Sequence, residues 1–240
     1  IVENCANTTQ DLSIISDFDD IKTGVVNIAD SLEGNMDSGE VKIGIIKWSS
    51  CGNVDEVIDL TDNHTNFVNA ANNMSPDGGG TYVSYALEQA YNMLNGANST
   101  LGAEKNILLI TDGQIYDVTV PCSLASLSAS QLTSQMTLGL FSNGVQVKIQ
   151  TIGVGSGINV GQLETLASSP DLAYTADFDT FASDISNQIA LTSCDENPVG
   201  DNPDLVYWNA SGCCENLNLP DIVVSVSADT SVSGGYSFVF

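Results

Sequence analysis

Apolar residues recur along this chain with two different periods, and segments of the two kinds alternate. The first set has the three- and four-residue spacing of one helix face: Phe18, Ile21, Val25, Ile28 and Leu32. Residues 41–48 then show a strand pattern, and a turn at residues 51–53 leads into a second strand pattern over residues 54–60. These patterns predict a helix followed by two neighbouring strands.

The same alternation continues to residue 191. Helical patterns cover residues 83–94, 123–141, 161–167 and 178–189, and strand patterns cover residues 106–111, 145–154 and 172–176. Residues 107–110 are apolar without interruption, as expected of a strand that is buried on both faces of a parallel sheet. Strands that alternate with helices predict an α/β fold, with a doubly wound, mostly parallel sheet and helices on both faces.

The pattern changes near the end of the chain. Residues 195–220 contain three of the six prolines and show no clear period, whereas residues 221–228 and 236–240 alternate like strands around a Ser/Gly-rich turn. We therefore predict a main domain over residues 1–194. Residues 195–240 are predicted to form a disulfide-pinned linker and a short C-terminal β extension.

The charge balance excludes several classes of partner. The chain has 30 acidic residues and five basic ones, all of them lysine, for a formal net charge of −25. Nucleic acids and anionic lipid surfaces are recognised through clustered cations, which this composition lacks. No apolar run approaches the ~20 residues of a membrane-spanning helix. A folded and strongly anionic protein remains, and divalent cations are its natural small partners.

Cysteines and glycosylation sequons favour secretion. The chain has six cysteines but no Cys-x-x-Cys pair, and its only histidine is His64, so a zinc cluster that contains histidine is not expected. An even number of cysteines together with Asn-x-Ser/Thr sequons favours a secreted, extracellular glycoprotein with disulfides. The cysteines are Cys5, Cys51, Cys122, Cys194, Cys213 and Cys214. Glycans are expected at Asn7, Asn63, Asn98 and Asn209. A fifth sequon, at Asn73, is discounted because Pro76 follows it.

Catalysis is not expected from this composition. One histidine, no arginine and no nucleophile elbow leave no catalytic triad to assemble. The glycines of residues 153–157 only weakly match a nucleotide-binding loop, because the P-loop lysine is missing. We therefore predict a protein without catalytic residues.

Two loops lie at the carboxyl ends of predicted strands, where open α/β sheets bind their ligands. Residues 78–81 lead into a helix and end in Thr81, and Asp112 directly follows the buried strand. A carboxylate and a hydroxyl are hard oxygen donors, which suit Ca²⁺ or Mg²⁺. In the alternative interpretation, Thr81 and Asp112 only cap helices and shape turns.

Five segments in their order along the chain resemble the von Willebrand factor A (VWA) domain of the extracellular type. They are Val41-Lys-Ile-Gly-Ile-Ile-Lys-Trp-Ser49, Gly78-Gly-Gly-Thr-Tyr-Val-Ser-Tyr-Ala-Leu87, Ile107-Leu-Leu-Ile-Thr-Asp-Gly113, Ile152-Gly-Val-Gly155 and Leu163-Glu-Thr-Leu-Ala-Ser-Ser-Pro170. The resemblance implies a Rossmann-like fold, adhesion or matrix binding, and a metal-ion-dependent adhesion site. That site combines an Asp-x-Ser-x-Ser loop after the first strand with a threonine and an aspartate, which carry over to Thr81 and Asp112.

The first loop of that site departs from the family pattern. The family has an apolar strand and then Asp-x-Ser-x-Ser before the helix that is here expected near Phe18. At that place the chain has only Glu3-x-Cys5-x-Asn7, a degenerate form of the motif. An intact motif, Asp229-Thr-Ser231-Val-Ser233, instead follows the strand pattern of residues 222–228.

Three interpretations of this motif stay open. In the first, Glu3 and Asn7 belong to a decayed site, and a segment like Tyr236–Phe240 supplies the missing part of its strand. In the second, residues 222–233 are the first strand and its loop, permuted to the C-terminus and donated to a neighbouring chain. The expected ligands of a Ca²⁺ or Mg²⁺ ion are then Thr81, Asp112, Asp229, Ser231 and Ser233. In the third, the intact motif only forms a hairpin turn.

The resemblance implies two kinds of function. The first is a structural subunit that assembles into an extracellular filament or matrix by sharing strands, as a head-to-tail homopolymer or with another matrix protein. Tyr236, Phe238 and Phe240 form one aromatic face, which favours a strand that completes the sheet of a neighbouring copy. The alternative is a metal-dependent adhesion module that binds a carboxylate of its ligand.

The family topology also implies disulfide partners. Three cysteines are expected near the carboxyl ends of the strands and should supply at least one bridge among themselves: Cys5, Cys51 and Cys122. Cys194 follows the last helix at the opposite end, and we expect it to pair with Cys213 or Cys214.

Overall fold

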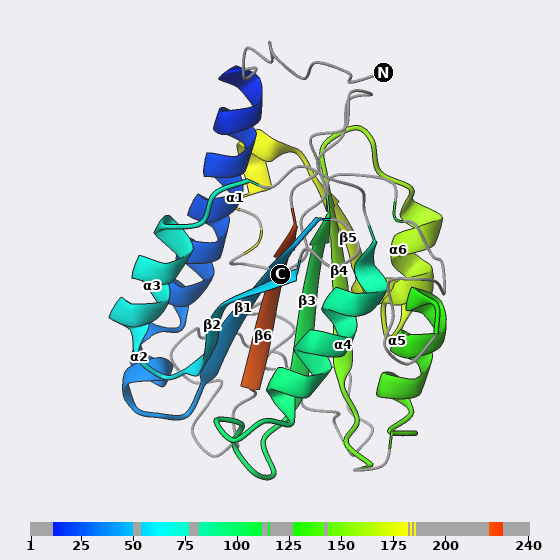
Figure 1. Cartoon of the computed structure of the whole chain (residues 1–240). Coiled ribbons are helices and arrows are strands. Elements are labelled where there is room, and N and C mark those ends of the chain that lie inside the picture. The colour runs from blue at the N-terminus through cyan, green and yellow to red at the C-terminus, as the bar shows by residue number, and fades with distance from the viewer. Residues whose placement is uncertain are drawn as a thin grey trace, which may run out of the picture.

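The computed structural model describes residues 12–49, 54–76, 82–111, 115, 127–141, 144–181, 183, 185 and 221–227. These residues form a six-stranded sheet with helices on both faces (Figure 1). The strands are β1 (Lys42–Trp48), β2 (Val54–Thr61), β3 (Lys105–Thr111), β4 (Lys148–Val154), β5 (Ala173–Ala176) and β6 (Asp221–Ser227). The helices are α1 (Leu12–Ser31), α2 (Glu33–Asp37), α3 (His64–Asn72), α4 (Val83–Leu94), α5 (Ala129–Thr137) and α6 (Val160–Leu166). A short 3-10 helix, Pro170–Leu172, precedes β5, and residues 178–181, 183 and 185 are helical. The predicted α/β fold class is thereby confirmed.

The strand order in the sheet is β2-β1-β6-β3-β4-β5. β2 runs antiparallel to β1 at one edge of the sheet, whereas all the other neighbouring strands are parallel. β6 therefore lies at the centre of the sheet, although it is the last of the described strands along the chain (Figure 1). Asp221 is aligned with both Lys42 of β1 and Lys105 of β3, and Ser227 is aligned with Trp48. Backbone ladders on both sides thus hold this strand.

The position of β6 differs from the prediction. The sequence pattern assigned these residues to a β extension appended after residue 194. Of the open interpretations, the first left the first-strand position to a segment like Tyr236–Phe240, and the second gave it to residues 222–233 donated to a neighbouring chain. In the structure, Asp221–Ser227 fills the position between β1 and β3 of its own chain. The local pattern shows that a segment is a strand, but its neighbours in the sheet depend on complementarity across the whole fold. The aromatic residues 236–240 lie outside the described residues.

Two layers of apolar side chains hold the helices against the sheet. On one face, Ile21 of α1 belongs to the same buried cluster as Ile45 of β1. On the other face, Leu87 of α4 and Leu132 of α5 share a cluster with Ile46 of β1. Neighbouring residues of one strand therefore supply both layers, as the two-residue period of a strand requires. The helical stripe predicted for α1 is confirmed, because its positions within the helix are all buried.

Some element boundaries differ from the sequence expectation. α5 is shorter than the predicted helix of residues 123–141 because Ser128 caps it, and Ser128 and Gln131 form a capping box. α3 was not predicted at all. Only Phe67 and Ala71 of this helix are fully buried, so its apolar stripe is too sparse to reveal a helical period.

Candidate functional site

Five parallel strands end at the same edge of the sheet, which we call the carboxyl edge (Figure 1). Their last residues are Trp48, Ser227, Thr111, Val154 and Ala176. In open α/β sheets, the crevice outside this edge is where ligands bind. The carboxyl edge is therefore the part of the fold in which a functional site is expected.

The metal ligands predicted from the sequence all lie outside the described residues. They are Thr81, Asp112, Asp229, Ser231 and Ser233, with Glu3 and Asn7 as the alternative first loop. The described part of the chain nevertheless comes within two residues of Thr81, Asp112 and Asp229. Asp112 directly follows β3, Asp229 follows the end of β6 by two residues, and α4 begins two residues after Thr81. The six cysteines and the sequons at Asn7 and Asn209 also lie outside the described residues.

The sequence patterns did not single out three hydroxyl side chains that are buried near the carboxyl edge. Ser49 follows β1, Thr111 ends β3, and Ser84 lies in the first turn of α4; each is at most 1% exposed. A buried hydroxyl is costly unless it is hydrogen-bonded, so these groups indicate a polar lining at this end of the sheet. The signal that could have revealed them is a serine or threonine at the end of a strand or the start of a helix.

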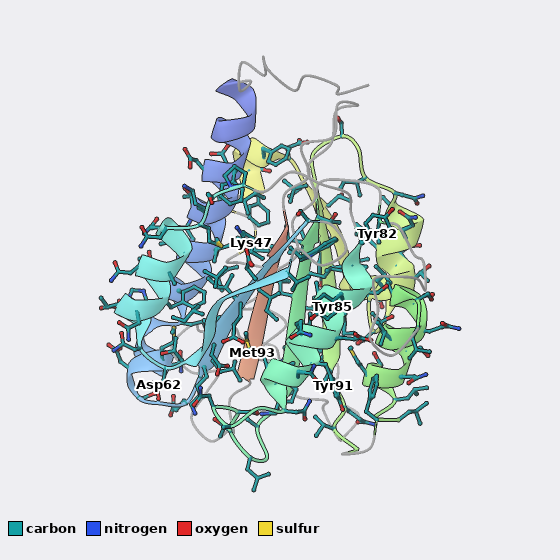
Figure 2. All side chains as sticks on the ribbon, viewed as in Figure 1. Lys47, Asp62, Tyr82, Tyr85, Tyr91 and Met93 are labelled. Carbon is teal, nitrogen blue, oxygen red and sulfur yellow. The ribbon has the colours of Figure 1, made fainter. Side chains whose placement is uncertain are left out.

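Lys47 anchors the segment that leads towards the Gly-rich loop of residues 78–81. It lies near the end of β1 (Figure 2), and its Nζ is 3.3 Å from the backbone oxygen of Ser75 and 3.5 Å from Oδ2 of Asp55. The lysine side chain is only 10% exposed. Its hydrogen bond therefore ties the chain after α3 to the end of β1 and fixes the point at which the next loop begins.

Trp48 is fully buried at the last position of β1. Its side chain belongs to the apolar layer that also contains Val83 and Leu87 of α4. Within the described part of the chain, its indole Nε1 is the one buried side-chain polar atom that lacks a hydrogen-bond partner. An unpaired buried donor costs about 1–3 kcal/mol. Native proteins keep such groups mainly at functional or strained positions, or where a bound water supplies the acceptor.

Carboxylates gather where α1 meets the helical residues after β5. The pKa of Asp20 is raised above its usual range, first by burial and then by the negative charges of Asp179 and Asp19. Among the residues that the structure describes, no group of three or more His, Cys, Asp or Glu side chains is arranged to hold a metal ion.

The histidine lies away from the carboxyl edge, at the start of α3. His64 Nε2 is 2.8 Å from Oδ1 of Asp30 in α1, and His64 Nδ1 is 3.6 Å from Oε1 of Glu33 in α2. Its ring thus connects three helices and has a structural role there.

The family follows from comparison of the sequence with known domains. The sequence model of the von Willebrand factor type A domain matches residues 13–188, which is well over half of the chain. The chain therefore belongs to this family. The matched residues end before β6, so the central strand of the sheet comes from outside the family match. Comparison with curated protein sequences finds no match.

Several solved structures share the fold. Proximal thread matrix protein 1 from the mussel byssus is 19% identical with a TM-score of 0.55, and the match covers 75% of this chain and 43% of that chain. The pilus adhesin SpaC from Lactobacillus rhamnosus GG is 20% identical with a TM-score of 0.53, and the match covers 71% of this chain and 27% of SpaC. The vWF domain of the type V pili tip protein Mfa5 from Porphyromonas gingivalis is 12% identical with a TM-score of 0.57. This match covers 80% of this chain and 93% of the Mfa5 domain. At these identities the likeness is one of fold.

The chain spans less than half of the length of the mussel protein and about a quarter of SpaC, at 43% and 27%. Membership of this family is consistent with a structural or adhesive role, and domains of this kind are usually not enzymes. Members of the family commonly bind a metal ion at the adhesion site. None of the described helices is long and apolar enough to span a membrane.

Proposed function

We propose that this chain is a secreted, non-catalytic adhesion domain that binds a carboxylate of its ligand through a Ca²⁺ or Mg²⁺ ion at the carboxyl edge. The position of β6 between β1 and β3 carries the proposal. β6 takes the place of the missing first strand, and the intact motif Asp229-Thr-Ser231-Val-Ser233 follows it directly. The second interpretation of the sequence is therefore favoured, with the strand supplied by the same chain.

Chain connectivity supports the convergence of the predicted ligands. Consecutive Cα atoms are ~3.8 Å apart, so the Cα of Asp112 lies about 4 Å from that of Thr111, and the Cα of Asp229 lies within about 8 Å of that of Ser227. Their strands, β3 and β6, are direct neighbours, and neighbouring strands are about 4.8 Å apart. The strands that lead to the two aspartates are therefore side by side at the carboxyl edge, which supports a common site for both carboxylates.

The chemistry of the predicted ligands fits a hard divalent cation. Two carboxylates, from Asp112 and Asp229, and three hydroxyls, from Thr81, Ser231 and Ser233, provide oxygen donors only. Ca²⁺ and Mg²⁺ prefer oxygen ligands. The alternative first loop with Glu3 and Asn7 is not required, because β6 already occupies the strand position that this loop would follow.

The charge of the protein gives the ion a specific role. A net charge of −25 repels acidic ligands in general, and the chain has only five lysines to attract them. A bound divalent cation is then the largest local positive charge, and it can accept one oxygen of a ligand carboxylate in its coordination sphere. Adhesion to an acidic partner should therefore depend strictly on the ion.

Metal titration tests the proposal. Ca²⁺ or Mg²⁺ should raise the melting temperature of the wild-type protein, and ion at 100 times its Kd should add about 2.7 kcal/mol of stability. Asp112→Ala and Asp229→Ala should each abolish this gain. The matched control is Asp37→Ala, since Asp37 is an exposed aspartate at the end of α2 and should leave the gain intact.

The adhesive function needs a separate measurement. A surface coated with carboxylate groups should retain the protein in Mg²⁺ or Ca²⁺ and release it when EDTA is added. The proposal is wrong if the Asp112→Ala variant is stabilised and retained as well as the wild type.

Strand sharing is the second candidate function, and the origin of β6 favours it. The 35 residues between Ile185, the last helical residue that the structure describes, and β6 could span at most roughly 115 Å at about 3.3 Å per residue. That reach allows β6 to enter its own sheet or the sheet of another copy, and open repetition of such a contact would give a filament. The shared strand is then β6 itself, in place of the segment Tyr236–Phe240 to which the sequence pattern assigned this role.

Mixed refolding tests strand sharing. Two differently tagged batches of the chain, partly unfolded together at high concentration and then refolded, should yield mixed oligomers. Batches mixed in the fully folded state should stay separate, because exchange requires the central strand to leave its sheet. Refolding that yields only monomers would exclude this second function.

A further inference from the structure

The edge of the sheet opposite the carboxyl edge carries two sequons in neighbouring loops. Asn63-His-Thr65 follows the end of β2, and Asn98-Ser-Thr100 lies between α4 and β3. β2 ends beside the start of β1, because Thr61 is aligned with Ile43. Both sequons therefore lie at the amino ends of β1 and β3.

Asn63 presents its amide nitrogen for modification while its oxygen caps α3. Its Oδ1 accepts a hydrogen bond of 2.8 Å from the backbone N–H of Asn66, and its side chain is exposed. Its Nδ2 makes no hydrogen bond within the described part of the chain. A sugar on Nδ2 would therefore leave the helix cap intact.

Asn98 lies at the same corner of the molecule. Its backbone oxygen accepts a hydrogen bond of 2.8 Å from Nζ of Lys42, and its Nδ2 donates one of 2.6 Å to Oδ2 of Asp59. Asp59 belongs to β2 and lies four residues before Asn63. A glycosylated amide keeps one N–H, so the bond to Asp59 can persist after modification.

The third described sequon behaves differently. Asn73 is the C-cap of α3. The backbone oxygen of Ser75, in the same sequon, accepts a hydrogen bond from Lys47 near the carboxyl edge. Pro76 directly follows this sequon and disfavours its glycosylation. The described sequons that remain are thus confined to the edge away from the candidate metal site.

We propose that Asn63 and Asn98 both carry N-linked oligosaccharides and form a glycan-bearing corner beside the end of β2. The donor is an oligosaccharide linked to a lipid pyrophosphate. In each transfer, the bond between the anomeric carbon and the pyrophosphate oxygen breaks, and a bond from that carbon to the asparagine Nδ2 forms. One amide proton is lost to a base, and the lipid pyrophosphate is the leaving group.

This arrangement has a physical consequence for assembly. β2 is an edge strand, and an exposed edge can pair with the edge of another molecule. Asp55 and Glu56 of β2 are exposed and already make this edge acidic, and two glycans at its end would block it further. The seven-residue strand β1 spans about 20 Å at ~3.3 Å per residue, which separates the glycans from the carboxyl edge. The ligand-binding edge would thus stay free of sugar.

The inference shares with the proposed function only the expectation that the chain is secreted. To test it, the full chain is secreted from eukaryotic cells behind an added leader, and the product is treated with peptide N-glycosidase in heavy-oxygen water. The enzyme converts each glycosylated asparagine to an aspartate that carries one heavy oxygen. Peptide mass spectrometry should find this mark at Asn63 and Asn98, and not at Asn73.

Matched variants separate the glycan from the structural role of each asparagine. Thr65→Ala and Thr100→Ala remove the sequon but keep the asparagine, and each should abolish the mark at its own site only. Thr65→Ser keeps the sequon and should keep the mark. An unmarked Asn63 or Asn98 in the secreted wild-type protein overturns the inference, as does a mark at Asn73. Either result leaves metal binding at the carboxyl edge to be judged by its own titration.

Discussion

Trp48 and Ser227 lie opposite each other at the ends of β1 and β6, in the last pair of their parallel register. Trp48 is fully buried there, and its Nε1 has no acceptor among the described residues. The strand that precedes the intact Asp-x-Ser-x-Ser motif therefore ends beside a buried donor. The buried end of β1 is thus paired with the residue of β6 that stands two positions before Asp229 in the sequence.

Replacement of Trp48 tests whether its unpaired N–H is costly. Trp48→Ala should lower the free energy of unfolding by about 3–5 kcal/mol, because a large aromatic side chain leaves a cavity. Trp48→Phe also removes volume, but loss of the unpaired donor relieves about 1–3 kcal/mol and offsets part of the cost. Urea unfolding measures both values. If the phenylalanine variant loses as much stability as the alanine variant, the indole N–H has an acceptor in the native protein.

Gly24 is expected to be essential for packing between α1 and the last helical segment. A Cβ atom built on Gly24 would clash with the ring of Phe181, which is fully buried. Gly24→Ala should therefore destabilise the protein by about 1–3 kcal/mol through overpacking, although alanine favours helices. Gly34→Ala in α2 is the matched control, since nothing lies within 4 Å of the added atom, and it should be neutral or slightly stabilising. Phe181→Leu in the Gly24→Ala background should recover part of the loss, and equal effects of the two alanine substitutions would contradict this explanation.

The sequence could predict the elements whose buried faces repeat regularly. α1 was recognised because every buried position of its stripe faces the sheet, and β3 because all seven of its residues are buried. α3 was missed because Phe67 and Ala71 are its only fully buried residues, too few to show a helical period. The position of β6 stayed open among three interpretations for a different reason: the order of strands in a sheet is decided by long-range pairing, which leaves no local signal.

Only part of the candidate site could be read from the sequence. Motif spacing selected Thr81, Asp112 and the Asp229 motif, and these residues remain predictions. The buried hydroxyls of Ser49 and Thr111 were not selected, because serine and threonine at a strand end are common in any turn. Their importance is visible only from burial, which depends on the packed fold.

Asp20 should make the folded state more stable at mildly acidic pH than at neutral pH. Burial, Asp179 and Asp19 raise its folded-state pKa above the ordinary value of 3.8, whereas the unfolded chain keeps that value. At a pH between the folded-state and the unfolded-state pKa, the folded state binds more protons than the unfolded state. The free energy of unfolding therefore rises as pH falls through the raised pKa. Asp20→Asn should be more stable than wild type at pH 7, by a few tenths of a kcal/mol because solvent screens the charges. It should also lose this part of the pH dependence.

Urea unfolding of both proteins at neutral pH and at pH 4 to 5 measures this difference. Asp37→Asn, at an exposed position of α2, controls for the general effect of removing one negative charge from an acidic protein. A wild-type advantage over Asp20→Asn at pH 7 would mean that the carboxylate is stabilised in the fold, contrary to the prediction.

Truncation at the C-terminus should separate the role of β6 from that of the aromatic segment after it. A chain that ends at residue 220 loses a strand that pairs with both β1 and β3, so the sheet is divided at its centre and both apolar layers are opened to water. Such a chain should show no cooperative thermal transition. A chain that ends at residue 235 keeps β6 and the Asp229 motif, and its melting temperature should stay within a few degrees of the wild-type value.

A synthetic peptide of residues 217–235 should restore a cooperative transition to the shorter chain, because the vacant position accepts a strand irrespective of its covalent origin. The opposite pattern, a stable chain ending at 220 or an unfolded chain ending at 235, would show that another segment fills the centre of the sheet.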